Sequence, residues 1–302
     1  MQKLKAILTL IRFPNLVFIF LTQIIAYHFI ICPAVTSNFI LPTLSLQCAT
    51  LLYFSTVLIA AAGYIINDYF DMGIDMVNKP HKMTIEKFFS RRRIIIWHIL
   101  LNILGLMIAG YIAYHFVKLR FLSVQILCIF LLLVYSTTFK RKLLSGNLII
   151  AILTSLTLYT AALYEPKFHL YDFKNSYSVS LWIYLLFSFC ITFVREIIKD
   201  IEDVKGDLVQ KCETIPLVFG INRAKNIVFL IAFILISIIF LASVFLLHAN
   251  IILKITLLLG IVFPLFITLY LLWKANTSKQ FHQISTYIKI ITFIGILSMT
   301  LI

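Results

Sequence analysis

The chain has 302 residues, of which 62% are hydrophobic and only 13% are charged, and its formal net charge is +14. This composition excludes an ordinary soluble globular domain and predicts a membrane protein. The basic excess does not indicate nucleic acid binding, because Lys and Arg gather in short interludes between apolar runs rather than along one soluble face.

The apolar runs predict nine membrane-spanning helices, since each approaches the roughly 20 residues that a bilayer crossing requires. The expected spans in chain order are 10–32, 43–66, 94–116, 121–138, 147–164, 180–198, 226–247, 250–273 and 284–302. The first two share a stretch from Phe13 to Ile66 that holds no charged residue, and the break between them is expected around Pro33 to Pro42. No interlude has room for a soluble domain, so we expect one all-α polytopic domain over residues 1–302.

The N-terminal start and the cysteines point to no processing or metal site. Met1-Gln2-Lys3-Leu4-Lys5 is followed by an apolar run without a small-residue cleavage site, so we expect a retained first helix rather than a signal peptide. The five cysteines show no paired spacing, which favours small packing residues over a zinc site. They are Cys32, Cys48, Cys128, Cys190 and Cys212.

The distribution of Lys and Arg predicts the orientation. The N-terminal leader and the interludes after the second, fourth, sixth and eighth spans are rich in both residues, whereas the opposite interludes carry only Lys118, Arg120, Lys167 and Lys174. Basic loops stay in the cytoplasm. We therefore expect a multi-pass protein of the cell (inner) membrane with a cytoplasmic N-terminus and an external C-terminus.

Eight of the twelve acidic residues lie in two short clusters, Asn67–Asp75 and Glu196–Asp207, at the cytoplasmic ends of the second and sixth spans. On a helix, Asn67, Asp68, Asp71 and Asp75 share an arc of roughly 100°. Glu196, Asp200, Asp203 and Asp207 share an arc of about 60°, with Glu202 turned away and Lys199 nearer the edge. Each helix end therefore presents a file of oxygen ligands to one side.

Carboxylates packed this closely repel one another and are costly beside lipid. Mg²⁺ binds oxygen ligands and commonly bridges one or two carboxylates to substrate phosphates. The two clusters thus predict the halves of one Mg²⁺–diphosphate site. Basic residues beside them can hold phosphate oxygens, namely those of Asn78-Lys79-Pro80-His81-Lys82 and of Tyr135–Lys142, whereas Arg91–Arg93 are expected to face lipid headgroups.

These motifs resemble those of a known family. Asn67-Asp68-x-x-Asp71-x-x-x-Asp75 resembles the first aspartate motif of UbiA-type intramembrane prenyltransferases, and Asp200-x-Glu202-Asp203-x-x-x-Asp207 resembles the second. The Arg12-Phe13-Pro14-Asn15 start and the Tyr135-Ser136…Lys140 segment are similar to further family features. The likeness spans nearly the whole chain, including the number of spans.

The resemblance implies helices around a central cavity that opens sideways to lipid, and Mg²⁺-dependent transfer of a polyprenyl group from its diphosphate to an acceptor. It assigns the aspartates Asp68, Asp71, Asp75, Asp200, Asp203 and Asp207, together with Asn67, to the catalytic Mg²⁺–diphosphate set. The residues expected to bind substrate are Asn15, Asn67, Lys79, Lys82, Tyr135, Lys140, Arg141 and Lys199. An allylic cation would form, flanked by aromatic faces, and an aromatic carbon or a lipid hydroxyl would attack it.

One departure bears on the acceptor. Many relatives carry arginines and Arg-Pro after the first motif, whereas this chain has Asn78-Lys79-Pro80-His81-Lys82, and Lys lacks the bidentate geometry of Arg. This segment is nearest to the branch that makes geranylgeranylglyceryl ethers, so geranylgeranylglyceryl phosphate is one expected acceptor. An aromatic acceptor of quinone biosynthesis, such as 4-hydroxybenzoate, homogentisate or dihydroxynaphthoate, is the alternative.

Two other classes of function fit less well. Phosphatidyl transfer also uses membrane aspartates, but the expected Asp-Gly-x-x-Ala-Arg pattern is missing from this sequence. A divalent-cation or ion-coupled transporter would place its acids near the middle of the bilayer, whereas these acids lie at span ends.

Overall fold

The structure is a computed structural model that describes residues 2–37, 39–78, 85–209, 211–246 and 250–302, and the backbone alone at 73–78 and 245–246. Nine helical stretches among these residues are long and apolar enough to cross a membrane. They are Phe13–Thr36, Leu46–Met72, Arg91–Phe116, Leu119–Thr137, Ser145–Leu163, Ser176–Val209, Ile221–Val244, Ile251–Lys274 and Ser278–Leu301. The prediction of a nine-span, all-α membrane protein is confirmed.

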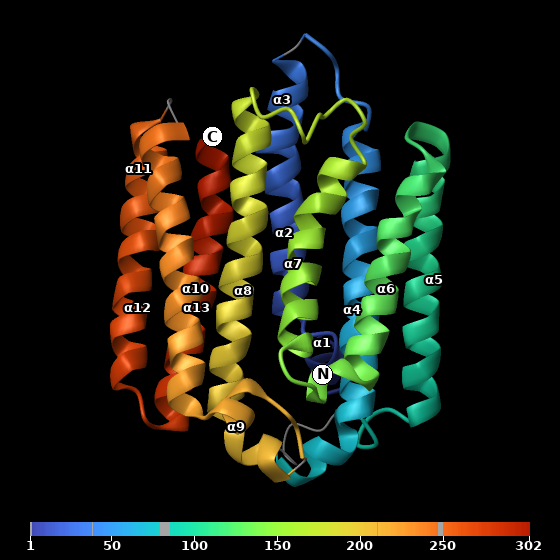
Figure 1. Ribbon diagram of the computed structural model, residues 1–302. Helices are drawn as coiled ribbons and strands as arrows, with labels where there is room; N and C mark the ends of the chain where they lie inside the picture. The colour runs from blue at the N-terminus through green and yellow to red at the C-terminus, as the bar shows by residue number, and fades with distance from the viewer. Residues whose placement is uncertain (1, 38, 79–84, 210, 247–249) are drawn as a thin grey trace.

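The helices run side by side as a bundle, with the N-terminus at the lower end of Figure 1 and the C-terminus at the upper end. The helical elements of the first half are α1 (Gln2–Leu10), α2 (Phe13–Ala26), η1 (Tyr27–Ile31), α3 (Cys32–Thr36), α4 (Leu46–Asn78), α5 (Arg91–Phe116), η3 (Leu119–Phe121), α6 (Leu122–Thr137), η4 (Phe139–Arg141) and α7 (Ser145–Leu163). Those of the second half are α8 (Ser176–Val209), α9 (Ile215–Phe219), α10 (Ile221–Leu241), η5 (Ala242–Leu246), α11 (Ile251–Leu257), η6 (Leu258–Val262), α12 (Phe263–Lys274), α13 (Ser278–Ser298) and η7 (Met299–Leu301).

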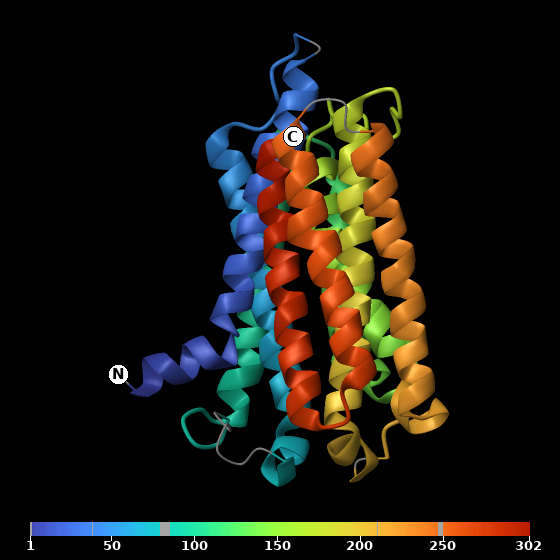
Figure 2. The ribbon, with the colours of Figure 1, turned by 90° about the vertical axis from the view of Figure 1, so that its left-hand side faces the viewer.

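The leader forms a helix of its own, which the sequence did not predict. Helix α1 leaves the bundle at a steep angle near its lower end (Figure 2). The break falls at Arg12, which adopts a left-handed backbone conformation with φ of 50°, and Pro14 then opens α2. Proline suits the first turn of a helix because the amide hydrogens there have no partner within the helix.

Two spans continue through a proline. A π-helical turn ends two residues before each proline: η1 ends before Pro33 and η6 before Pro264. Proline lacks an amide hydrogen and crowds the preceding turn, and a local widening of the helix accommodates it. The first span therefore reaches Thr36 instead of ending at the predicted residue 32.

Helices α4 and α8 are the longest elements, with 33 and 34 residues. Both extend beyond the predicted spans at the lower end of the bundle, so that each acidic cluster lies on a continuous helix. This continuity satisfies the assumption under which the sequence placed the acids on one face of each helix end.

The upper end is tied together by Glu165, which is 1% exposed. Its carboxylate accepts hydrogen bonds from the Tyr27 hydroxyl at 3.0 Å and from the backbone amides of Thr43 at 2.8 Å and Leu44 at 3.3 Å. Glu165 thereby joins the loop before α4 to the loop after α7, far from the acidic clusters.

Glu165→Ala is expected to destabilise the protein by about 3 kcal/mol, because it leaves buried donors without an acceptor. The measurement is thermal unfolding of the purified protein in detergent, with Asp172→Asn, an exposed acid in the same loop, as the control. Equal midpoints for Glu165→Ala and the control would contradict the structural role of Glu165.

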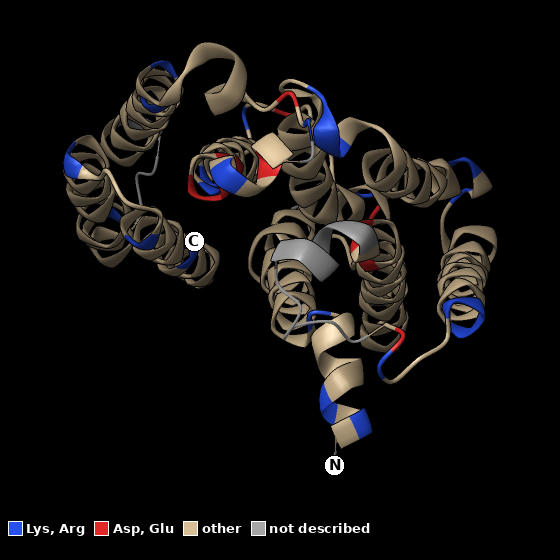
Figure 3. Cartoon of the chain, turned by 90° about the horizontal axis from the view of Figure 1, so that it is seen from below, with Lys and Arg blue, Asp and Glu red and all other residues tan. Residues whose placement is uncertain are grey.

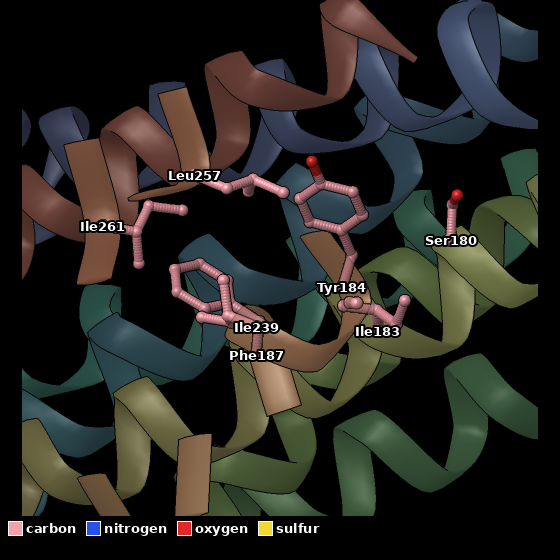
Figure 4. A pocket seen from close by; sticks show the side chains of 8 residues that line it. Ser180, Ile183, Tyr184, Phe187, Ile239, Leu257 and Ile261 are labelled. Atoms are coloured by element: carbon pink, nitrogen blue, oxygen red, sulfur yellow. The ribbon is translucent and has the colours of Figure 1, made fainter. Parts of the chain in front are cut away.

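A small apolar cavity lies between α8, α10 and the η5–η6 region (Figure 4). Tyr184, Phe187, Ile239 and Leu257 help to line it, and its volume is about 20 Å³. That volume holds roughly one water molecule. This cavity is therefore too small for a prenyl chain.

Candidate active site

Three side chains of the first cluster are arranged at the lower end of α4. Asn67 and Asp71 are buried, and the Asn67 side-chain amide donates to an Asp71 carboxylate oxygen at 2.9 Å. The Arg12 guanidinium donates to Asp68 at 2.9 Å and lies 5.1 Å from the centre of the Tyr64 ring. Asp68 is therefore held by a residue outside α4, and Asp71 is held by a residue one turn earlier on α4.

Lys140 is the second cation at α4. Its ammonium contacts the same Asp71 oxygen that Asn67 binds. Lys140 lies in η4, and the following helix approaches it closely, since a Cβ on Gly146 would lie only 3.0 Å from the Phe139 carbonyl oxygen. A glycine at this position lets the basic turn fold back against the start of α7.

The second cluster is held from a different direction. Asp200 on α8 accepts a hydrogen bond from the Asn147 side-chain amide of α7 at 2.8 Å. One turn earlier, Glu196 accepts from Lys199 at 2.6 Å and from Arg195 at 3.2 Å. Asn147 thus contacts Asp200, while two cations share Glu196, which lies one turn further inside the bundle.

A single short segment links the two acidic helices. Lys140 binds Asp71 of α4, and Asn147, seven positions later, binds Asp200 of α8. Tyr135 of α6, at the start of this segment, lies close enough to Asp71 and Asp200 for both carboxylates to act on its hydroxyl. The segment Tyr135–Asn147 therefore brings the clusters into one region.

Of the other residues predicted for the site, some lie at the end of α8 or in η4, and some lie outside the described residues. Asp203 is exposed and Asp207 is half-buried on the last turns of α8, and the Asp207 carbonyl accepts from the Cys212 amide at 3.0 Å. The Arg141 side chain is exposed, and its carbonyl accepts from the Glu213 amide at 2.8 Å. The Asp75 side chain, Lys79 and Lys82 lie outside the described residues.

Glu202 faces another helix. Its carboxylate lies 2.8 Å from Nδ1 of His282 on α13, and its carbonyl accepts from the Ser278 hydroxyl at 3.0 Å. The sequence placed Glu202 off the arc of the other acids, and these contacts agree with that placement.

The oxygen donors at the ends of α4 and α8 decide whether the site fits a divalent cation. No three His, Cys, Asp or Glu side chains within the described ranges converge on a common point. The chemistry of the donors nevertheless suits a hard cation, because carboxylate and amide oxygens are its preferred ligands. The Asn67 amide oxygen is buried and meets no hydrogen-bond partner among the described residues, which leaves it available as a ligand.

The sequence alone does not pair Arg12 with Asp68 or Asn147 with Asp200. Arg12 directly precedes the first apolar span. Asn147 follows the basic turn directly, in Ser145-Gly146-Asn147. Figure 3, viewed from the lower end, shows acidic residues in red and basic residues in blue on the helix ends and loops that face the viewer.

Among the described residues, nine apolar spans carry carboxylates, amides and basic side chains gathered at one end of the bundle, which defines a membrane protein with a charged site at the end of its helices. The family model described as the UbiA prenyltransferase family matches residues 26–290. The chain belongs to the UbiA prenyltransferase family, and it is a membrane-embedded prenyltransferase. The family resemblance that its motifs indicated is confirmed.

Two relatives are similar over most of their length. The chain is 30% identical to a digeranylgeranylglyceryl phosphate synthase of Methanosphaera stadtmanae over 239 residues, which cover 78% of this chain and 81% of the relative. It is 32% identical to an enzyme of the same name from Hyperthermus butylicus over 227 residues, which cover 74% and 70%.

Solved structures share the fold. A structure described as providing insights into the biosynthesis of digeranylgeranylglyceryl phosphate synthase in membranes matches with a TM-score of 0.72 and 24% identity, covering 100% of this chain and 98% of the other. A UbiA homologue from Archaeoglobus fulgidus bound to DMAPP and Mg²⁺ matches with a TM-score of 0.67 and 19% identity, covering 96% and 98%. Both neighbours confirm the all-helical fold.

Proposed function

We propose that this prenyltransferase moves a geranylgeranyl group from geranylgeranyl diphosphate to geranylgeranylglyceryl phosphate, and that the reaction requires Mg²⁺. The relatives described above carry the name of the corresponding synthase. Digeranylgeranylglyceryl phosphate differs from the proposed acceptor by one geranylgeranyl group, and that group must be placed on the remaining glycerol hydroxyl. The transfer forms a bond between this oxygen and C1 of the donor, breaks the C1–diphosphate bond and releases the hydroxyl proton.

The link between Asp71 and Asp200 through Lys140 and Asn147 carries the proposal. It brings two helix ends rich in carboxylates together with a lysine that can pair with phosphate instead of Asp71. A diphosphate bound between the helices would therefore meet oxygen ligands for its metal on both sides and a cation from η4.

We assign Asn67, Asp68, Asp71, Asp75, Asp200, Asp203 and Asp207 to the metal–diphosphate set. When bound, Mg²⁺ would neutralise the charge that develops on the departing diphosphate. Lys140 and Arg12 pair with these carboxylates and would turn toward phosphate oxygens when the diphosphate binds. Tyr135 lies near both clusters, and Asn15, Lys79, Lys82, Arg141 and Lys199 complete the proposed substrate-binding set.

The proposed orientation follows from the distribution of charge. The N-terminus and the lower ends of α4 and α8 lie at the same end of the bundle (Figure 1), which also carries most of the basic residues. The positive-inside rule places this end in the cytoplasm. The diphosphate site would then face the compartment that contains Mg²⁺ and soluble precursors.

An acceptor panel tests the choice of substrate. Purified protein with geranylgeranyl diphosphate and Mg²⁺ is expected to prenylate geranylgeranylglyceryl phosphate at least about tenfold faster than 4-hydroxybenzoate, homogentisate or dihydroxynaphthoate. Liquid chromatography with mass spectrometry identifies the products. Faster prenylation of an aromatic acceptor would replace the proposed acceptor with the alternative from quinone biosynthesis.

A further inference from the structure

A second group of charges lies deeper in the bundle than the acidic helix ends. Arg195 precedes Asp200 by five residues on α8, which is about 7.5 Å along a helix. Lys289 on α13 is the only Asp, Glu, Lys or Arg between residues 280 and 302. Charged side chains within a membrane span are costly and commonly mark a ligand site.

These two cations belong to one region. Helix α13 packs against both α8 and α2, and Arg195 lies close enough to Lys289 for their charges to interact. The Lys289 ammonium donates to the Asn15 side-chain oxygen of α2 at 3.4 Å and lies 5.3 Å from the centre of the Phe18 ring. The region is thus bounded by α2, α8 and α13, whereas Lys140 and Asn147 approach the acids from the side of α6 and α7.

The hydrogen bonding of this region is incomplete. Arg195 uses one terminal nitrogen for Glu196, but its Nε is buried and has no hydrogen-bond partner among the described residues. A buried donor without an acceptor costs free energy. An anionic ligand beside Arg195 would remove that cost.

The cations of this region also lack anionic partners. Lys199 and Arg195 share one Glu196 oxygen, and among the described residues Lys289 forms no ion pair and donates only to the Asn15 amide oxygen. A phosphate monoester, which carries a charge of about −1.5 to −2 at neutral pH, would give Lys289 an anionic partner and the Arg195 Nε an acceptor.

We propose that Arg195 and Lys289, with Asn15, form a second anion site that binds the phosphate monoester of the lipid acceptor. This inference rests on the proposed function, in which that acceptor is a glyceryl phosphate. The site gives the acceptor a position of its own, separate from the diphosphate of the donor. It also explains why charges occur deeper in the spans than the acidic helix ends, where the acceptor hydroxyl must meet the allylic carbon.

Kinetics with each substrate varied in turn test this site. Lys289→Gln and Arg195→Gln are each expected to raise the KM for geranylgeranylglyceryl phosphate by about 10- to 100-fold, since each removes a charge-assisted contact. The KM for geranylgeranyl diphosphate is expected to stay at the wild-type value. Lys289→Arg, which keeps the charge, is expected to retain most of the acceptor affinity, and Lys254→Gln, on α11 near the upper end, is the matched control.

The substrate whose KM changes shows which ligand Arg195 and Lys289 bind. A rise in the KM for the donor alone, or an equal rise for both substrates, would assign Arg195 and Lys289 to the diphosphate and overturn the proposal. Unchanged kinetics in both variants would overturn it as well.

A binding measurement separates this proposal from the proposed function. In buffer with a chelator and without donor, geranylgeranylglyceryl phosphate is expected to raise the unfolding temperature of the wild type, whereas unphosphorylated geranylgeranylglycerol is not. The shift is expected to disappear in Lys289→Gln and to persist in Lys254→Gln. A wild type that binds the phosphate but transfers no prenyl group to it would contradict only the proposed function, and a wild type without the shift would overturn the second anion site.

Discussion

Asp71→Asn and Asp200→Asn are each expected to slow prenyl transfer by at least about 100-fold, the loss typical when a group that stabilises developing charge is removed. Each substitution replaces a carboxylate oxygen by an amide nitrogen that cannot bind a cation. The two residues lie on different helices and are linked through Lys140 and Asn147. If the helix ends form one site, loss of either carboxylate disables it. Initial rates of the purified variants at saturating substrate give the comparison.

Glu202→Gln is the matched control for these variants. Glu202 lies on α8 only two residues from Asp200, but it contacts His282 of α13. We expect it to retain wild-type activity. If Asp200→Asn and Glu202→Gln are both folded and Asp200→Asn retains wild-type activity, the end of α8 takes no part in the reaction.

Lys140→Gln is expected to lower kcat/KM for the diphosphate donor by about 100-fold. Lys140 contacts Asp71 in the described structure and is the cation of η4 that can turn from this carboxylate to phosphate. Steady-state kinetics with the donor varied measure the effect. Lys142→Gln serves as the control, since Lys142 is an exposed lysine of the same turn and lies over the Phe139 ring.

The stability of the Lys140 variant distinguishes two roles. Thermal unfolding of Lys140→Gln is expected to stay close to that of the wild type, because the Asn67 amide still donates to Asp71. A variant that unfolds early but, once folded, keeps the donor kinetics of the wild type would make Lys140 a structural partner of Asp71 and contradict its role in binding diphosphate.

Hydropathy was sufficient to predict the architecture, because each bilayer crossing requires a long apolar helix. The ends of the helices were harder to predict. Helices α4 and α8 continue well past their apolar parts, since polar residues can extend a helix into the aqueous layer. The separate helix α1 depends on the left-handed backbone of Arg12. This conformation is uncommon for residues other than glycine, and composition does not indicate it.

For the site, helical periodicity grouped the acids on each helix and set Glu202 apart. It could not pair residues across helices. The contacts of Arg12 with Asp68, of Lys140 with Asp71 and of Asn147 with Asp200 join positions 53 to 69 residues apart. Such pairings depend on how the helices pack, and Glu165 at the opposite end, which holds loops from two parts of the chain, was missed for the same reason.

The most direct test of the central claim is to measure diphosphate release and product together in purified protein reconstituted in nanodiscs. With geranylgeranyl diphosphate, geranylgeranylglyceryl phosphate and Mg²⁺, the wild type is expected to release one diphosphate for each digeranylgeranylglyceryl phosphate formed. Both signals should be lost with chelator, in Asp71→Asn and in Asp200→Asn. Equal product formation by the wild type and either variant, or product formation that continues with chelator, would contradict a single metal-dependent site at the ends of α4 and α8.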